Sequence, residues 1–113
     1  MSAAGPTILP AEALALRSLI TPTEQGIASR VLARTRGGNV TLFAFDAGQA
    51  LTEHTSPFDA LVIVLEGSLV LTVGGTPVQA TPGVIVRMPA SVPHAVDAPG
   101  PARMLLIVLR DGA

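Results

Sequence analysis

Short apolar segments separated by closely spaced turn signals constrain this chain more than any other feature. From residue 27 onward, β-branched and aliphatic runs are interrupted by glycine, proline and asparagine at intervals of roughly 8 to 12 residues. The clearest turn is Arg36–Asn39 (Arg-Gly-Gly-Asn), because glycine and asparagine adopt the positive φ of tight hairpins. Strand-like runs never alternate with helix-length periodic segments, which disfavours a parallel α/β sheet. The pattern therefore predicts an all-β sandwich or barrel.

Two of the expected strands are apolar on both faces. In an antiparallel sheet, continuous apolar runs such as Ala60–Leu65 and Met104–Leu109 imply that the outer face is covered as well. A second copy of the chain would cover it, so we expect a homodimer. The alternative is that the N-terminal segment folds over that face. The expected strands are Ile27–Thr35, Val40–Phe45, Leu61–Leu65, Leu69–Val73, Val84–Met88 and Met104–Leu109.

The first 20 residues read differently from the rest. Residues 1–20 are expected to be a leader with one short helical turn within residues 11–20, and residues 21–113 to be the barrel domain. Thr21 precedes Pro22, which pushes it toward extended geometry and ends any helix. Pro6, Pro10 and Glu12 interrupt the stretch that a signal peptide would keep apolar. We therefore expect no export signal.

Composition excludes several classes of function. Charged residues make up only 13% of the chain and the formal net charge is -1, which gives no electrostatic case for binding nucleic acid or anionic lipid. No aliphatic run approaches the roughly 20 residues of a membrane-spanning helix, so no membrane partner is expected. Zero cysteines exclude disulfides, thiolate metal sites and a cysteine nucleophile, and fit a cytoplasmic protein.

The only two histidines, His54 and His94, lie in distinctive local settings. Residues 48–67 run from a glycine through five residues to His54 and on to a second glycine, which resembles the first motif of the cupin superfamily. Residues 82–96 carry a Pro-Gly turn, a strand, a second proline and then His94, which resembles the second cupin motif. The resemblance implies an all-β, antiparallel jelly-roll barrel of the small single-domain type. An immunoglobulin-like sandwich is the alternative, and it would place the histidines far apart.

The metal-ligand set that the resemblance implies is incomplete. The family's usual site has two histidines and a glutamate in the first motif and one histidine in the second. His54 and His94 match two of these positions, whereas Ser56 and Ala60 stand at the other two. A metal held by protein normally has at least three protein ligands. Two imidazoles with water would hold zinc, nickel or copper weakly, and an iron site would need the neighbouring Asp59 or another acid to turn inward.

Three functions stay open at this point. The first is a non-enzymatic protein that binds a small molecule in the barrel, with His54, Ser56 and His94 lining the pocket. The second is a metal-dependent enzyme, of the dioxygenase or isomerase type, that uses the two histidines. The third is a structural or assembly module whose pocket is vestigial and filled by phenylalanine or methionine side chains. Thr52, His54 and Ser56 are expected to share one face of an alternating segment, which places Ser56 beside His54.

Overall fold

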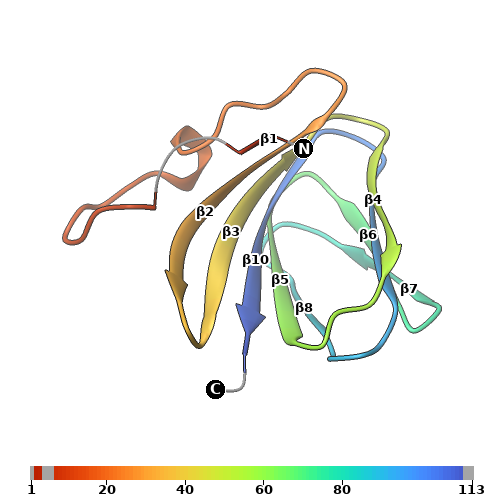
Figure 1. Cartoon of the computed structure of the whole chain (residues 1–113). Coiled ribbons are helices and arrows are strands. Elements are labelled where there is room, and N and C mark those ends of the chain that lie inside the picture. Colours follow the sequence, from red (N-terminus) through yellow and green to blue (C-terminus); the bar gives the residue numbers. More distant parts are fainter. Residues whose placement is uncertain (1, 4–6, 111–113) are drawn as a thin grey trace.

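The computed structural model describes residues 2–3 and 7–110 and consists of two facing β-sheets (Figure 1). The described residues form ten strands and one short 3₁₀-helix, η1 (Leu16–Ser18), and none of their helices is long and apolar enough to span a bilayer. The strands are β1 (Ser2–Ala3), β2 (Ile27–Thr35), β3 (Gly38–Phe45), β4 (Gln49–His54), β5 (Asp59–Glu66), β6 (Leu69–Val73), β7 (Thr76–Ala80), β8 (Ile85–Met88), β9 (His94–Ala98) and β10 (Ala102–Leu109).

The strand order confirms the predicted all-β jelly-roll architecture. One sheet has six strands in the order β1-β2-β3-β10-β5-β8, and the other has four in the order β4-β9-β6-β7. Every strand pair is antiparallel except β1 with β2, which is parallel. Strands that are neighbours in space are often distant in sequence, and both histidine-bearing strands, β4 and β9, pair in the smaller sheet. The sandwich alternative with separated histidines is therefore wrong.

The main core lies between the two sheets and follows from the period-two alternation of the strands. In β5, Ala60, Val62 and Val64 are buried, while the residues between them point to the outer face and are only partly covered. The same alternation continues in β10, where Ala102 and Met104 are buried. The buried members of this core are Ile27, Phe43, Phe45, Ala60, Val62, Val64, Leu69, Leu71, Ala80, Met88, Val96, Ala98, Ala102 and Met104.

A second apolar cluster lies on the outer face of the six-stranded sheet. The segment that follows η1 packs there, and Ile20 is buried against side chains of β2 and β3. The N-terminal segment therefore covers part of the outer face. This was the alternative to a partner subunit that the sequence left open. The buried members of this outer-face cluster are Ile20, Ala28, Leu32, Leu42 and Ala44, with Leu16, Leu19, Val40, Leu65 and Leu105 packed against them.

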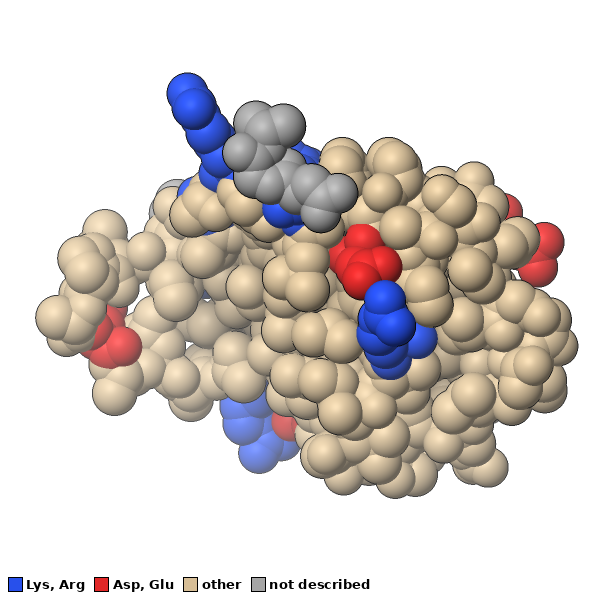
Figure 2. Space-filling view, turned by 90° about the horizontal axis from the view of Figure 1, so that it is seen from below, with Lys and Arg blue, Asp and Glu red and all other residues tan. Residues whose placement is uncertain are grey.

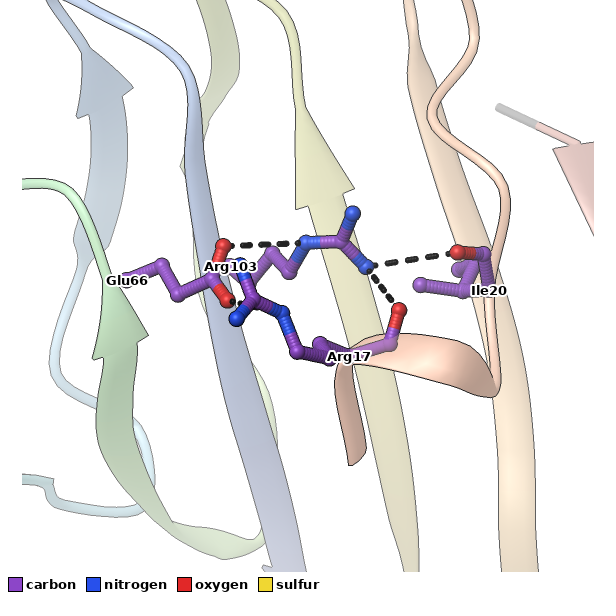
Figure 3. Close-up of polar contacts among 4 residues, drawn as sticks. All are labelled: Arg17, Ile20, Glu66 and Arg103. Atoms are coloured by element: carbon purple, nitrogen blue, oxygen red, sulfur yellow. Dashed lines mark hydrogen bonds and ion pairs between the residues drawn. The ribbon is translucent and has the colours of Figure 1, made fainter. Parts of the chain in front are cut away.

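A polar clamp holds this N-terminal segment on the sheet (Figure 3). The Arg103 guanidinium donates hydrogen bonds to the carbonyl oxygens of Arg17 (2.9 Å) and Ile20 (3.2 Å) and forms an ion pair with Glu66 (3.3 Å). Glu66 also pairs with Arg17 at 3.3 Å, but the Arg17 side chain is 75% exposed, and exposed pairs contribute little. The Arg103 side chain is only 16% exposed, so its bonds to the two carbonyls are the stronger part of the clamp.

The sequence pattern predicts the strands of the larger sheet better than those of the smaller one. In the smaller sheet the pattern predicts β6, whereas β4, β7 and β9 are not predicted as strands. Strand β4 is largely exposed and polar, which removes the apolar alternation that marks a strand. Strand β7 contains Pro77, which a sheet accepts only at an edge such as this one. The short helical turn expected within residues 11–20 is the 3₁₀-turn η1.

Candidate functional site

A cavity of about 140 Å³ opens between the two sheets, inside the barrel. Strands of both sheets contribute to its wall, which is apolar apart from two imidazoles and one hydroxyl. His94 is 5% exposed and lies in the wall, whereas His54 is exposed at the mouth. The cavity is lined by Leu51, His54, Ser56, Ala60, Met88, His94, Val96, Met104, Leu106 and Val108.

The loop before β9 fixes the position of His94. Proline rings at Pro89 and Pro93 restrict its backbone. Between them, Ser91 adopts a φ of +63° and donates its backbone N–H to the carbonyl of Ser56 at 2.7 Å. This bond ties the loop that carries His94 to the segment that follows His54. The two histidines are therefore held together by the backbone as well as by their side chains.

An irregularity in β4 sets the direction of His54. The register between β4 and β9 shifts between Leu51 and His54, which then pairs with His94. Because of the shift, Leu51 lines the cavity with His54, and Thr52 is exposed. The expectation that Thr52 shares the face of His54 and Ser56 is therefore wrong, because Thr52 does not line the cavity. Ser56 does lie at the cavity, next to His54.

The two imidazoles face each other through their Nε2 atoms, which are 3.2 Å apart. Their ring centroids lie 4.4 Å apart with an interplanar angle of 71°. Each Nδ1 atom lies near a backbone carbonyl, that of Thr52 at 2.9 Å for His54 and that of Val92 at 3.1 Å for His94. Since a carbonyl oxygen only accepts, each Nδ1 carries the proton and donates it. Both Nε2 lone pairs then point at the same place.

This arrangement contains one contact more than two neutral rings can satisfy. A neutral imidazole has one N–H group, so the pair supplies two protons for three contacts. With both protons on the Nδ1 atoms, no proton lies between the two Nε2 atoms, and both of them are hydrogen-bond acceptors. The pair therefore offers two acceptor nitrogens to a hydrogen-bond donor in an otherwise apolar cavity.

The donor set does not fit a resident metal centre of the family's four-ligand kind. Two nitrogens bound to one tetrahedral zinc lie about 3.3 Å apart, and carbonyl-anchored Nδ1–H groups are typical of ligating histidines. His54 and His94 thus suit two coordination positions. Ala60 offers no donor, and the Ser56 hydroxyl oxygen accepts a bond from the N–H of Phe58 at 3.2 Å. Residues 2–3 and 7–110 contain no group of three or more His, Cys, Asp or Glu side chains arranged around one point.

Asp59 lies outside the cavity and has a different set of partners. One carboxylate oxygen accepts a hydrogen bond from Arg87 at 2.9 Å, and the other accepts one from the N–H of Ala90 at 2.8 Å. These bonds, with that of Arg87 first, lower the pKa of the Asp59 carboxyl below its ordinary value. Both oxygens are therefore used in holding β8 and the loop that carries His94, and the structure does not bring Asp59 to the histidines.

The glycines of the two motifs have a backbone role. Gly48, Gly67 and Gly83 all have positive φ, at +80°, +69° and +86°. A Cβ atom on Gly67 would also overlap the carbonyl oxygen of Pro101. Only glycine adopts these conformations freely, so the three motif glycines are required by turns of the barrel and not by a binding or catalytic role. Ser91, in the loop of the second motif, also has a left-handed φ of +63° although it is not a glycine.

Several residues of the cavity wall were not predicted as site residues from the sequence. Leu106 and Val108 line the cavity because they alternate with the outward residues of β10. Val96 is placed by the same alternation in β9, a strand the sequence did not reveal. Leu106 and Val108 could have been predicted from the sequence, because every second residue of β10 after the buried Met104 points to the same face.

A two-sheet jelly-roll barrel with paired histidines in its interior defines a cupin-type protein. The model of the Cupin domain family matches residues 41–108, which is more than half of the chain and includes both histidines. The chain belongs to this family. A search of curated proteins found no match.

Two solved structures resemble this one over nearly its whole length, and neither of their names assigns an activity. A conserved protein of unknown function from Streptococcus pyogenes, SPY1581, is 31% identical, with a TM-score of 0.88, and the alignment covers 96% of this chain and 95% of that one. A cupin superfamily protein from Desulfitobacterium hafniense is 29% identical, with a TM-score of 0.86, over 94% of this chain and 97% of that one. The polyketide cyclase RemF from Streptomyces resistomycificus, 19% identical with a TM-score of 0.69 over 77% of this chain and 67% of that one, shares the fold.

Proposed function

We propose that this cupin binds a small, mostly apolar molecule in the barrel cavity and orients it through one polar group that faces His54 and His94. The single observation that carries the proposal is the unfilled cavity of about 140 Å³ with two Nε2 atoms 3.2 Å apart at its polar end. A carboxylic acid group complements the two Nε2 acceptors, because its proton can be shared between a carboxyl oxygen and an imidazole nitrogen in a strong hydrogen bond. The proposal also includes the two expectations from the sequence that the protein is cytoplasmic and that it forms a homodimer.

The size of the cavity limits the ligand. An apolar cavity of about 150 Å³ holds a molecule the size of benzene. A ring with one carboxylate has about nine non-hydrogen atoms, and at about 0.3 kcal/mol per atom its binding free energy is about 3 kcal/mol. Such a ligand would bind in the millimolar range or tighter.

The two other functions are less well supported. A vestigial pocket would be filled by aromatic or methionine side chains, yet Phe43 and Phe45 pack in the core and Met88 and Met104 leave the cavity open. A metal-dependent enzyme is favoured only by the paired Nε2 atoms, because the remaining ligand positions hold Ser56 and an alanine. Metal analysis of untagged protein distinguishes it: near-stoichiometric metal that disappears when both histidines are replaced by alanine favours the enzyme.

Calorimetric titration with matched acids and amides tests the binding proposal. Benzoate and butyrate are compared with benzamide and butyramide on the wild-type chain and on His54→Gln and Ala60→Leu variants. The acids should bind saturably and more tightly than the amides, since the carboxyl group supplies a more acidic proton to the Nε2 acceptors than an amide group does. Ala60→Leu should abolish binding of all four compounds, and His54→Gln should remove the preference for acids.

A matched control separates the cavity from the rest of the surface. Ile85→Ser replaces an apolar side chain that is 56% exposed on the edge strand β8 and should leave all titrations unchanged. If neither acids nor amides bind saturably to wild-type protein at concentrations up to tens of millimolar, the proposed function is wrong. Equal binding to wild-type and Ala60→Leu protein would place the ligand elsewhere.

A further inference from the structure

None of the described residues that line the barrel cavity is a lysine, arginine, aspartate or glutamate. The polar side chains of the wall are those of His54, Ser56 and His94, and the other lining residues are aliphatic or methionine. The connections that flank the two histidines, β4–β5 and β8–β9, lie at the lower end of the barrel in Figure 1. Figure 2 shows this end from below, and charged side chains are sparse on it. A ligand in the cavity is therefore recognised mainly through hydrogen bonds.

The loop between β4 and β5 holds Ser56 in a fixed position. Its hydroxyl oxygen accepts a hydrogen bond from the N–H of Phe58, two residues further on, at 3.2 Å, which is the pattern of a serine turn. Its carbonyl oxygen accepts a bond from the N–H of Ser91 at 2.7 Å. Side chain and backbone of Ser56 are therefore both held before a ligand enters the cavity.

The Ser56 hydroxyl still has a proton to donate. A serine hydroxyl has one O–H donor and two lone pairs, and the contact with Phe58 uses one lone pair. Within the part of the chain that the structure describes, no acceptor receives this proton, and no hydrogen bond joins the hydroxyl to either imidazole. Because Ser56 lines the cavity, its O–H can be donated to a ligand there.

The three polar side chains of the cavity thus differ in hydrogen-bonding character. The Nε2 atoms of His54 and His94 are acceptors, because both Nδ1 atoms donate to backbone carbonyls. The Ser56 hydroxyl is a donor. A ligand group that carries both a proton and an accepting oxygen, as a carboxylic acid does, complements all three side chains, whereas a group with an N–H donor alone leaves the Ser56 proton without a partner.

We propose that the Ser56 hydroxyl determines the specificity of the cavity by donating to the second oxygen of a carboxylic acid whose proton is shared with the Nε2 atoms. Ser56 stands at the motif position of the second histidine, so the change that removes a metal ligand supplies a hydrogen-bond donor for an organic acid. The ligand class is then a small apolar carboxylic acid bound through both of its oxygens. This inference rests on the proposed function, because it assigns the contacts of a ligand in the same cavity.

Chemical-shift titration of nitrogen-15-labelled protein with two ligands of equal size tests this role of Ser56. Benzoate and indole have the same number of non-hydrogen atoms, but the indole N–H is a donor and the ring offers no accepting oxygen. Ser56→Ala should weaken benzoate binding about three- to tenfold and change indole binding by less than about twofold, because only benzoate loses a hydrogen bond. Ser56→Thr keeps a hydroxyl group and should retain the wild-type preference for benzoate.

Two further variants separate this contact from general effects on the loop and the cavity. Thr55→Ala removes a neighbouring hydroxyl that is exposed and does not line the cavity, so it should leave the binding of both ligands unchanged. Ala60→Leu fills the cavity and should abolish both. Infrared spectra of benzoate labelled with carbon-13 at its carboxyl carbon detect the contact on the ligand itself. The carboxyl bands of the bound ligand should shift in Ser56→Ala and stay at their wild-type positions in Ser56→Thr.

The comparison of two ligands on one protein distinguishes a specific contact from a structural role. Ser56→Ala protein that binds benzoate and indole equally weakly, or both as tightly as wild-type protein does, overturns the role of Ser56 and leaves the proposed function standing. Carboxyl bands that do not change in Ser56→Ala overturn it as well. Wild-type protein that binds neither ligand overturns the proposed function, and this inference with it.

Discussion

Filling the cavity with Ala60→Leu should stabilise the protein and at the same time remove its binding site. Ala60 lies in β5 with its side chain toward the cavity, at the position where the family pattern has glutamate, a longer side chain. Leucine adds three carbon atoms, and each buried methylene contributes about 0.8 kcal/mol, giving an upper limit of about 2.4 kcal/mol. The cavity is open at the exposed His54, so burial is incomplete, and we expect a gain of about 1–2 kcal/mol.

The sign of this change is the informative quantity. Without a cavity, three extra carbons would overpack the core and cost about 1–3 kcal/mol. The unfolding entropy of a 113-residue domain makes 1 kcal/mol equal to about 4 °C in Tm. The expected gain is therefore about 4–8 °C.

Thermal and urea denaturation, followed by circular dichroism, measure both quantities on one sample. Urea titration gives the free energy of unfolding, and an unchanged slope shows that the unfolded states are comparable. Ala28→Leu is a matched control, because Ala28 is 1% exposed within the outer-face cluster and its enlargement should overpack that cluster and destabilise the fold. A Tm that falls for Ala60→Leu as it does for Ala28→Leu would refute the account of an open cavity.

Three further substitutions test the backbone and electrostatic arguments. Gly67→Ala should lower the free energy of unfolding by about 2–4 kcal/mol in urea titration, because its Cβ overlaps the Pro101 carbonyl at positive φ; an unchanged midpoint would contradict this. Ser91→Gly should raise stability by about 0.5–1 kcal/mol by relieving a left-handed φ, and a loss would mean that its backbone is not strained. The Asp59 carboxyl, whose pKa is lowered by Arg87, stabilises the fold above pH 3.8, and this contribution is lost as the pH falls below that value. Asp59→Asn should lower Tm at pH 6 and flatten the decline of Tm between pH 5 and pH 3; an unaltered decline would show that another group is responsible.

The larger sheet could be predicted from the sequence because its strands carry the strongest patterns. The expected strands 27–35, 40–45 and 61–65 coincide with or fall within observed strands of this sheet. Their β-branched residues and glycine turns are local signals that agree with the tertiary fold. The smaller sheet was predicted less well, since most residues of β4 and β7 are exposed and these strands show no clear alternation of apolar and polar residues.

The candidate site was predictable only through its two motif positions. His54, Ser56 and His94 were singled out by spacing, and the structure gathers all three at one cavity. The distance between the two Nε2 atoms, their carbonyl partners and the exclusion of Thr52 depend on the register shift in β4, which no local pattern encodes. Asp59 illustrates the same limit, because its partner Arg87 lies 28 residues away and reaches it only across the β5–β8 pair.

Nitrogen-15 NMR of the histidine side chains tests the central claim most directly. The claim is that the cavity beside His54 and His94 receives a small acidic molecule. Titration of benzoate into uniformly labelled wild-type protein should shift the Nε2 resonances of both rings saturably, leave the Nδ1 protons on their carbonyl partners, and fail in Ala60→Leu. Nε2 resonances that stay unchanged at saturating benzoate, or that shift equally in Ala60→Leu, would contradict the account.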